Sequence, residues 1–250
     1  MKNFLPETKE EADALFKAID LSNLGVVAPH KYKIINSYDM DWLCYTIDKG
    51  VPLKYATFWK ADEGCENNML SQWYKGDPIP INGRKYVTAE QYMMSEKALL
   101  FNDIDSYIKI MNEPDPQRCK RLGRGVKNFD ATVWNEAFKE IIFHGNLGKL
   151  QSDINIVYAL LETENAVIIE ASPLDDIYGA GMAKDDLLNS DGSLKIHPNQ
   201  WHKEGSKNRA QNNLGFILMG LRDLFRQLMG FIYTPEMKKE HVIGEYTEED

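Results

Sequence analysis

A carboxylate and an amine stand on one segment of this chain, TAEQYMMSEKALLF, which spans residues 88–101. Glu90 and Lys97 are seven residues apart, close to two helical turns, so both would project from about the same helix face. A carboxylate can take up a proton, and an amine of lowered pKa can attack a carbon centre or bind a phosphate. Helix physics alone favours a solvated pair of surface charges, because a glutamate in the first turn commonly stabilises a helix.

The start of this helix is marked by a capping box. Thr88 is followed three residues later by Gln91, so the threonine hydroxyl can accept from the Gln91 N–H while the glutamine side chain returns to the Thr88 amide. Glu90 then occupies the second helical position, where the positive end of the helix dipole favours its ionised form.

A second candidate site is the segment EASPLDDIYGAG, residues 170–181. A buried strand that runs into Asp175 and a Gly-x-Gly is a common way to present a carboxylate at a strand end, with Gly179 allowing close backbone approach to a ligand. An ordinary Asp-rich turn explains the same residues equally well. The segment has no GxGxxG, so it is not a dinucleotide fingerprint.

Hydrophobic periodicity predicts a fold that is α+β, a helix-dominated single domain with a small sheet. Predicted helices cover residues 7–20, 89–101, 104–112, 131–143, 147–163 and 212–233, with Gly145 ending the fourth of these. Residues 25–35 and 41–60 read as extended, and residues 165–172 as a buried strand. Loops are expected at 61–85, with a short hairpin at Asn82-Gly83, and over most of 172–208.

Composition excludes several classes of protein. The 250 residues carry 29 Lys and Arg against 38 Asp and Glu, which argues against a protein that coats nucleic acid but leaves room for a local basic patch. The 3 cysteines form no CxxC or Cys/His pattern, so we expect no disulfide framework and no zinc site. No segment reads as a signal peptide or membrane span, so we expect a cytoplasmic protein.

Seven segments taken together resemble the NADAR family, the YbiA-like N-glycosidases. They are SQWY, YVTAEQYMMSEKALLF, LGRGVKNFDATVW, GKL, LLET, EASPLDDIYGAG and NNLGFILMGLRD, in this order. The resemblance covers about residues 57–229. It implies an N-terminal extension at 1–50, a NADAR-like domain at 51–233 and an acidic C-terminal tail at 234–250.

The resemblance implies hydrolysis of an N-glycosidic bond, without a cofactor or a metal. Some members act on phosphorylated ribosylamino-pyrimidine intermediates of riboflavin biosynthesis, and others remove ADP-ribose from guanine in nucleic acid or nucleotides. We favour the second substrate, an ADP-ribosylated guanine in single-stranded DNA or a nucleotide. A cognate ADP-ribosyltransferase toxin is then an implied partner, with this chain as its antitoxin.

The family motifs also assign roles to residues. Glu90, Lys97 and Asp175 are the implied catalytic residues. The implied substrate contacts are Trp73, Tyr74, Arg124, Trp134, Tyr178 and Gly179, with Lys127 as an alternative to Arg124 for meeting phosphates. The chain departs from the family in having Tyr178 where Trp is usual, which keeps an aromatic face but loses the indole donor. Its polar stretch at 183–205 is also longer than usual.

Cleaving a glycosidic C–N bond builds positive charge on the sugar while the leaving nitrogen needs a proton. Glu90 would stabilise that charge or act as base, and Asp175 would donate the proton if burial raises its pKa. Lys97 would either take over an opened sugar as a Schiff base, which we favour, or bind a phosphate as a fixed cation. Two other readings stay open: a silent ADP-ribose or NAD-binding module, and a protein whose first 50 residues dock another chain.

Overall fold

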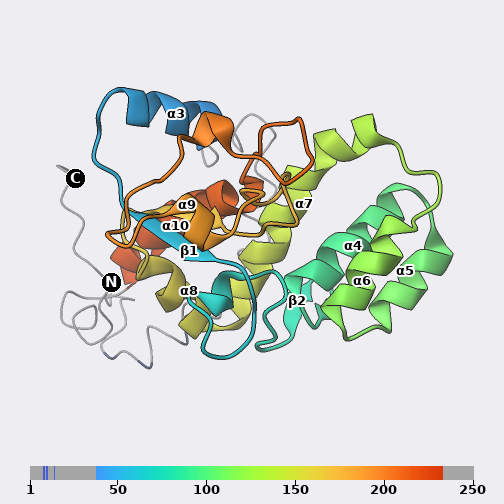
Figure 1. Ribbon diagram of the computed structural model, residues 1–250. Coiled ribbons are helices and arrows are strands. Elements are labelled where there is room, and N and C mark those ends of the chain that lie inside the picture. Colours follow the sequence, from blue (N-terminus) through green and yellow to red (C-terminus); the bar gives the residue numbers. More distant parts are fainter. Residues whose placement is uncertain (1–7, 9, 11–13, 15–37, 233–250) are drawn as a thin grey trace. The chain divides into compact units, whose positions relative to one another are not determined.

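The structure is a computed structural model that describes residues 8, 10, 14 and 38–232 of the chain (Figure 1). Its fold is α+β and dominated by helices, as the sequence predicts. The described chain divides into two compact units, one formed by residues 38–57 and 154–232 and the other by residues 58–153. The helix predicted at 7–20 and the extended segment at 25–35 lie outside the described residues, apart from three positions.

The unit formed by residues 58–153 is built around helix α4. Its elements are η2 (Asn68–Leu70), β2 (Ile79–Ile81), β3 (Arg84–Tyr86), α4 (Ala89–Leu100), α5 (Ile104–Met111), α6 (Pro116–Arg124) and α7 (Ala131–Ser152). Helix α4 packs against α5, α6 and α7. Helices α4, α5 and α6 lie side by side in Figure 1. Most of α4 is therefore buried, the segment that carries Glu90 included.

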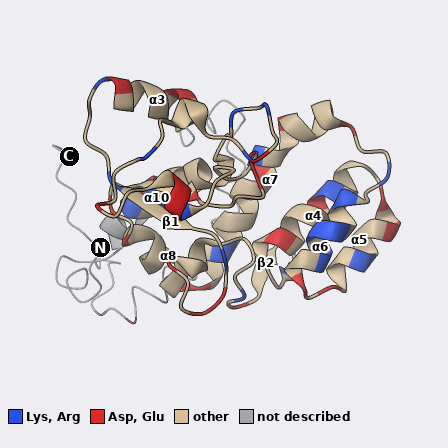
Figure 2. Ribbon diagram, in the orientation of Figure 1, with Lys and Arg blue, Asp and Glu red and all other residues tan. Residues whose placement is uncertain are grey.

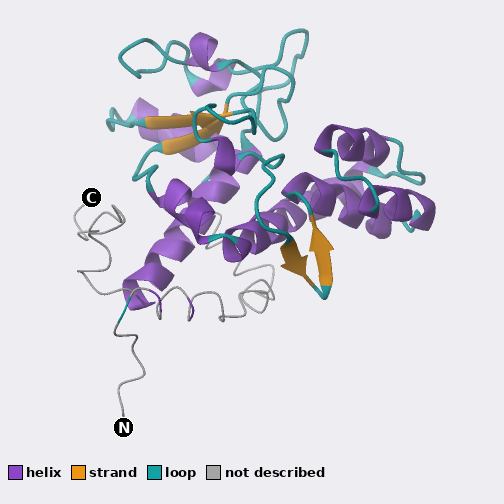
Figure 3. Ribbon diagram, turned by 90° about the horizontal axis from the view of Figure 1, so that it is seen from below, coloured by secondary structure: helices purple, strands orange, loops and turns teal. Residues whose placement is uncertain are grey.

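The hairpin predicted at Asn82-Gly83 is confirmed. Strands β2 and β3 pair antiparallel, with Ile79 opposite Tyr86 and Ile81 opposite Arg84 (Figure 3). Asn82 and Gly83 both have positive φ, 51° and 73°, which is the backbone that a two-residue turn of this kind requires.

Helix α7 runs without interruption through Gly145, so the prediction that this glycine ends a helix was wrong. A Cβ at position 145 would lie 2.7 Å from Cδ1 of Tyr92 on α4. The glycine is thus needed where the two helices approach closely, and tertiary packing outweighs its low helix propensity. The helix predicted at 147–163 is really the end of α7 and α8 (Ile154–Leu161).

Replacing Gly145 with Ala should therefore destabilise the protein, although alanine is the better helix former. We expect a loss of about 1–3 kcal/mol in the free energy of unfolding, the usual cost of forcing a methyl group into a packed core. Urea unfolding followed by circular dichroism measures it. Gly125→Ala is the matched control, because the nearest atom to its added Cβ is 3.4 Å away. Equal stability of the two variants would contradict this packing.

The sequence reasoning missed helix α6. Its start carries recognisable signals, because Asp115 caps it by accepting from the Arg118 N–H at 2.8 Å and Pro116 occupies the first turn. The neighbouring prolines and acidic residues conceal these signals. Arg124 is the last residue of α6. This candidate residue was therefore named without a prediction of the helix that carries it.

The other unit consists of a strand pair covered by helices. Its elements are α3 (Met40–Asp48), β1 (Tyr55–Phe58), α8, β4 (Val167–Glu170), α9 (Lys184–Leu187), η3 (Pro198–Gln200) and α10 (Asn213–Ile232). Strand β4, predicted as the buried strand, pairs with β1, and α10 packs against both β4 and α8. The predicted helix at 212–233 is α10.

The extended structure predicted for residues 41–60 is correct only at β1. Residues 40–48 form helix α3, which Asp39 caps by accepting from the Trp42 N–H at 2.7 Å. Met40 and Leu43 are buried, so the apolar residues of this segment face a core at helical spacing. Burial of that face overrides the β preference of the aromatic and branched residues.

Asn212 joins α10 to β4 and explains the NNLG segment. Its side chain donates from Nδ2 to Ile168 O at 2.9 Å and accepts at Oδ1 from the Glu170 N–H at 3.0 Å. The side-chain amide of Asn212 therefore hydrogen-bonds to the backbone of β4 as a neighbouring strand would. Gly215, one turn on, lets the helix approach, since a Cβ there would lie 2.1 Å from Ile168 O.

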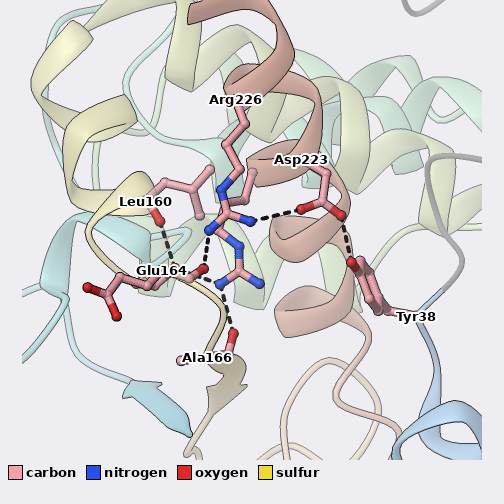
Figure 4. A network of polar contacts seen from close by, with 8 residues as sticks. Tyr38, Leu160, Glu164, Ala166, Asp223 and Arg226 are labelled. Atoms are coloured by element: carbon pink, nitrogen blue, oxygen red, sulfur yellow. Dashed lines mark hydrogen bonds and ion pairs between the residues drawn. The ribbon is translucent and has the colours of Figure 1, made fainter. Parts of the chain in front are cut away.

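Charged side chains fix the second half of α10 (Figure 4). The buried Arg222 donates to Thr163 Oγ1 at 2.8 Å and to Ala166 O at 2.7 Å, while Arg226 donates to Glu164 O. Asp223 accepts from the Tyr38 hydroxyl at 2.6 Å, so residue 38 is tied to the same unit.

In the described part of the chain, no helix is both long and apolar enough to cross a membrane.

Candidate functional site

The first turn of α4 is fixed from both sides. Thr88 accepts from the Gln91 N–H at 3.1 Å, which confirms the predicted N-cap. The Gln91 side chain accepts from the Val87 N–H at 2.7 Å, one residue before the position predicted. Its Nε2 also donates to the carbonyls of Ile110 and Glu113 at 3.0 and 3.1 Å, so α4 begins at one defined residue.

Glu90 is buried, with 2% of its surface exposed, so the reading as a solvated surface charge was wrong. Its carboxylate Oε2 accepts from the indole Nε1 of Trp73 at 3.3 Å, and its backbone N–H donates to Gln72 O at 3.0 Å. Removing a carboxylate from water costs free energy. The positive end of the helix and these hydrogen bonds offset part of that cost for Glu90. Glu90 is thus a buried carboxylate whose orientation is set by the Trp73 indole.

Lys97 lies further along α4 among aromatic rings. Its Nζ is 4.3 Å from the ring centroid of Phe129 and 5.3 Å from that of Trp134. The side chain is half-buried, and its burial, together with the positive charge of Arg124, lowers the pKa of Lys97 below the ordinary value. A larger share of neutral amine follows at a given pH, which is what a nucleophilic lysine needs.

The aromatic partner Phe129 was missed by the sequence reasoning. It lies in the loop before α7, is 47% exposed and packs against Phe101, whose ring centroid is 5.3 Å away. Trp134 is buried on the first turns of α7, as expected for a core aromatic, yet its ring also covers Lys97. Phe129 belongs to no helix or strand pattern in the sequence, so only its contacts with Phe101 and Lys97 in the fold identify it.

Arg124 lies at the end of helix α6, and its positive charge acts on Lys97. Helix α6 approaches α4 at Gly123, where a Cβ would lie 2.0 Å from Sδ of Met94, while Cys119 contacts the carbonyls of Ile110 and Glu113. The outer face of α6 carries basic residues and no acidic one between its ends (Figure 2). Lys127, the alternative to Arg124, instead pairs with Asp105 at 3.3 Å, which favours Arg124 as the cation available to a ligand.

Asp175 organises a tight loop in the other compact unit. Its Oδ1 accepts from the N–H groups of Ile177 and Tyr178 at 3.2 and 2.9 Å. A Cβ on Gly179 would lie 2.7 Å from Glu170 O, so close packing within the unit requires this glycine. The carboxylate, the tyrosine ring and the glycine are therefore set by local backbone bonds.

The same loop covers the start of α10. The carbonyls of Ile177, Tyr178 and Gly179 accept from the N–H groups of Asn213, Leu214 and Asn212, at 3.4, 3.0 and 3.1 Å. These are amides that a free helix start would offer to an anion. Because backbone carbonyls occupy them, the start of α10 is not an anion site.

The structure thus groups part of the predicted site. Trp73 contacts Glu90, the Trp134 ring lies beside Lys97, and the charge of Arg124 acts on Lys97, all within residues 58–153. Tyr74 lies beside a buried lysine on α7, Lys149, described below. Asp175, Tyr178 and Gly179 belong to the other unit. The catalytic and binding roles of all the predicted site residues stay predictions. Across the described ranges, no group of three or more His, Cys, Asp or Glu side chains could hold a metal ion.

Comparisons with known proteins agree with the family resemblance of the sequence. The profile described as NADAR domain matches residues 57–226, so the chain belongs to the NADAR domain family. It is 36% identical over 178 residues to the protein named N-glycosidase R617 of Acanthamoeba polyphaga mimivirus, covering 68% of this chain and 95% of that one. It is 33% identical over 104 residues to Protein irg-1 of Caenorhabditis elegans, covering 41% of this chain and 49% of that one.

The fold also has a solved relative. The NMR structure of the E. coli protein YbiA matches with a TM-score of 0.53 at 19% identity, covering 74% of this chain and 93% of that one. At this identity the match speaks for the fold alone. It supports the helix-dominated α+β architecture predicted from the sequence.

Proposed function

We propose that this protein is an N-glycosidase that removes ADP-ribose from guanine bases. One observation carries the proposal: α4 holds a buried carboxylate, Glu90, and an amine of lowered pKa, Lys97, the latter covered by aromatic rings. The name of the mimiviral relative, an N-glycosidase that matches over most of its length, supports the reaction class. The resemblance to the NADAR family and the chemistry of the surrounding residues support an ADP-ribosylated guanine as the substrate.

Glu90 acts on the charge that develops at the sugar. When the ribose ring opens, positive charge develops on C1′ and on the nitrogen bonded to it, and a carboxylate already desolvated stabilises this charge strongly. The Trp73 indole N–H donates to the carboxylate and so fixes its direction. Glu90 also serves as a base that relays protons between the attacking and leaving groups.

Lys97 forms a transient covalent bond with the sugar. The ribose ring opens when its oxygen takes a proton from water and the lone pair of the guanine amine forms an iminium with C1′. The neutral Lys97 amine adds to C1′, its proton passes through Glu90 to the guanine nitrogen, and that amine leaves. Water then adds to the lysine iminium, and Lys97 departs with a proton as the released sugar closes its ring.

The surrounding residues suit the two ends of this substrate. The exposed Phe129 and the ring of Trp134 offer faces on which a purine can stack, and Arg124 offers a guanidinium to a phosphate oxygen. The pyrophosphate and adenine of ADP-ribose provide such groups. A modified guanine in nucleic acid would be bound single-stranded or turned out of the duplex.

A panel of two substrates tests the proposal. We expect the purified protein to release ADP-ribose from a single-stranded oligonucleotide that carries one ADP-ribosylated guanine, measured by liquid chromatography. A phosphorylated ribosylamino-pyrimidine should be cleaved far more slowly. The opposite preference would replace the guanine substrate by the riboflavin-type substrate. Inactivity on both, with retained binding of ADP-ribose, would replace the enzyme by a binding module.

The charge of Arg124 should be visible in the pH dependence. Because the neutral amine of Lys97 reacts, kcat/KM rises as pH rises through the Lys97 pKa. Arg124 helps to lower that pKa, so Arg124→Gln should raise it and move the rising limb to higher pH. We expect a shift below about one pH unit, since an exposed charge is screened. An unmoved limb, as expected for the control Arg121→Gln, would argue against this coupling.

A further inference from the structure

Lys149 on α7 is a buried amine for which the proposed reaction has no direct use. Only 2% of its surface is exposed, and its Nζ donates to Ser71 O at 2.7 Å. The Tyr74 ring centroid lies 5.7 Å from the same nitrogen. Burial lowers the pKa of Lys149 to about 7, and among the described residues no carboxylate pairs with it to offset this.

Packing does not explain why this position is a lysine. An amine without a counter-ion loses hydration on burial, whereas an apolar chain of the same length would fill the space at lower cost. What the lysine adds is an N–H donor aimed at one backbone carbonyl.

Ser71 O closes a turn formed by residues Ser71–Tyr74, here called the SQWY turn. The carbonyl accepts from the Tyr74 N–H at 3.1 Å as well as from Lys149, and the Trp73 N–H donates to Ser71 Oγ at 3.3 Å. Asn146, one turn before Lys149 on α7, places its Nδ2 3.5 Å from Oε1 of Gln72. Helix α7 thus holds the first half of the turn at two points.

Two residues of the SQWY turn, Gln72 and Trp73, contact Glu90. The Gln72 carbonyl accepts from the Glu90 N–H at 3.0 Å, and the Trp73 indole N–H donates to the Glu90 carboxylate at 3.3 Å. A continuous series of hydrogen bonds therefore runs from Lys149 through the turn to the carboxylate.

We propose that Lys149 is a positioning residue that holds the SQWY turn so that the Trp73 indole directs the Glu90 carboxylate. Lys149 does not touch the reacting atoms. The placement of the turn follows from the geometry alone, and the effect on catalysis rests on the proposed function. A group held by two hydrogen bonds at one carbonyl keeps its orientation better than a group held by one.

The position of the indole can be measured without any substrate. The chain has 5 tryptophans, so a 15N–1H spectrum resolves few indole signals, and the Trp73 signal is the one absent in Trp73→Phe. We expect Lys149→Met to shift this signal while Lys139→Met, the same change elsewhere on α7, leaves it in place. An unshifted Trp73 signal in Lys149→Met would overturn the proposal. If the methionine variant does not fold, Lys149→Gln is measured in its place.

Kinetics test whether Lys149 acts through Trp73. Lys149→Met and Trp73→Phe should each lower kcat by about 10- to 100-fold with a smaller effect on KM, as expected when a catalytic group is misplaced. The double variant should be no slower than the slower single one. Fully additive losses, or a loss explained by a lower melting temperature, would contradict a positioning role. If the wild type lacks glycosidase activity, the proposed function fails and the indole signal alone decides.

Discussion

Glu90→Gln should lower kcat by about 10²- to 10⁴-fold, the usual contribution of a carboxylate that handles protons or charge in a transition state. Glutamine has the shape of glutamate and can still accept from the Trp73 indole, so the surrounding hydrogen bonds are kept. The loss therefore comes from the missing negative charge. Steady-state release of ADP-ribose from the modified oligonucleotide measures it.

The matched control for this prediction is Glu96→Gln, on the same helix. Glu96 is half-buried, and burial raises its pKa, so the pair of variants compares two partly or fully buried glutamates of α4. We expect Glu96→Gln to keep nearly normal turnover. Circular dichroism and the melting temperature show whether each variant is folded. A folded Glu90→Gln variant with wild-type kcat would remove Glu90 from the catalytic site.

Lys97→Arg should lower kcat by at least about 10³-fold, as expected for removal of a covalent nucleophile. Guanidinium keeps the positive charge and can still pack on Phe129 and Trp134, yet it cannot form the imine. Borohydride added during turnover should reduce the wild-type imine to a stable amine. Peptide mass spectrometry then locates the added sugar on Lys97.

Lys97→Met separates the two roles considered for this lysine. If Lys97 only binds a phosphate, the arginine variant should be nearly normal and the methionine variant should show a raised KM. If Lys97 forms the imine, both variants should be inactive. Near-normal turnover of Lys97→Arg would therefore end the covalent mechanism and leave the lysine as a fixed cation.

Features with a local cause could be predicted from the sequence. The Asn-Gly turn between β2 and β3 and the Thr88 cap of α4 depend on residues within a few positions of each other. The long amphipathic α10 was also visible from its periodicity. Gly145 and α3 were misread because their structure depends on distant partners, the Tyr92 ring in the first case and a buried helix face in the second.

The candidate site shows the same limit. Spacing indicated that Glu90 and Lys97 share α4, but it could not tell burial from exposure, and only the fold shows that Glu90 is inside. Phe129 lies in a loop and had no local signal, and Lys149 belongs to the quoted segment GKL, which gave no hint of its burial or its contact with Ser71. Residues of this kind become visible only through the contacts they make.

One measurement tests the central claim most directly: the mass of both products after a single turnover on an oligonucleotide with one ADP-ribosylated guanine. We expect intact ADP-ribose together with an oligonucleotide restored to unmodified guanine, and neither product with Glu90→Gln. This pair of masses requires cleavage of the N-glycosidic bond. An oligonucleotide that keeps a ribose or phosphoribose on its guanine, or equal product from Glu90→Gln, would contradict an N-glycosidase built around Glu90.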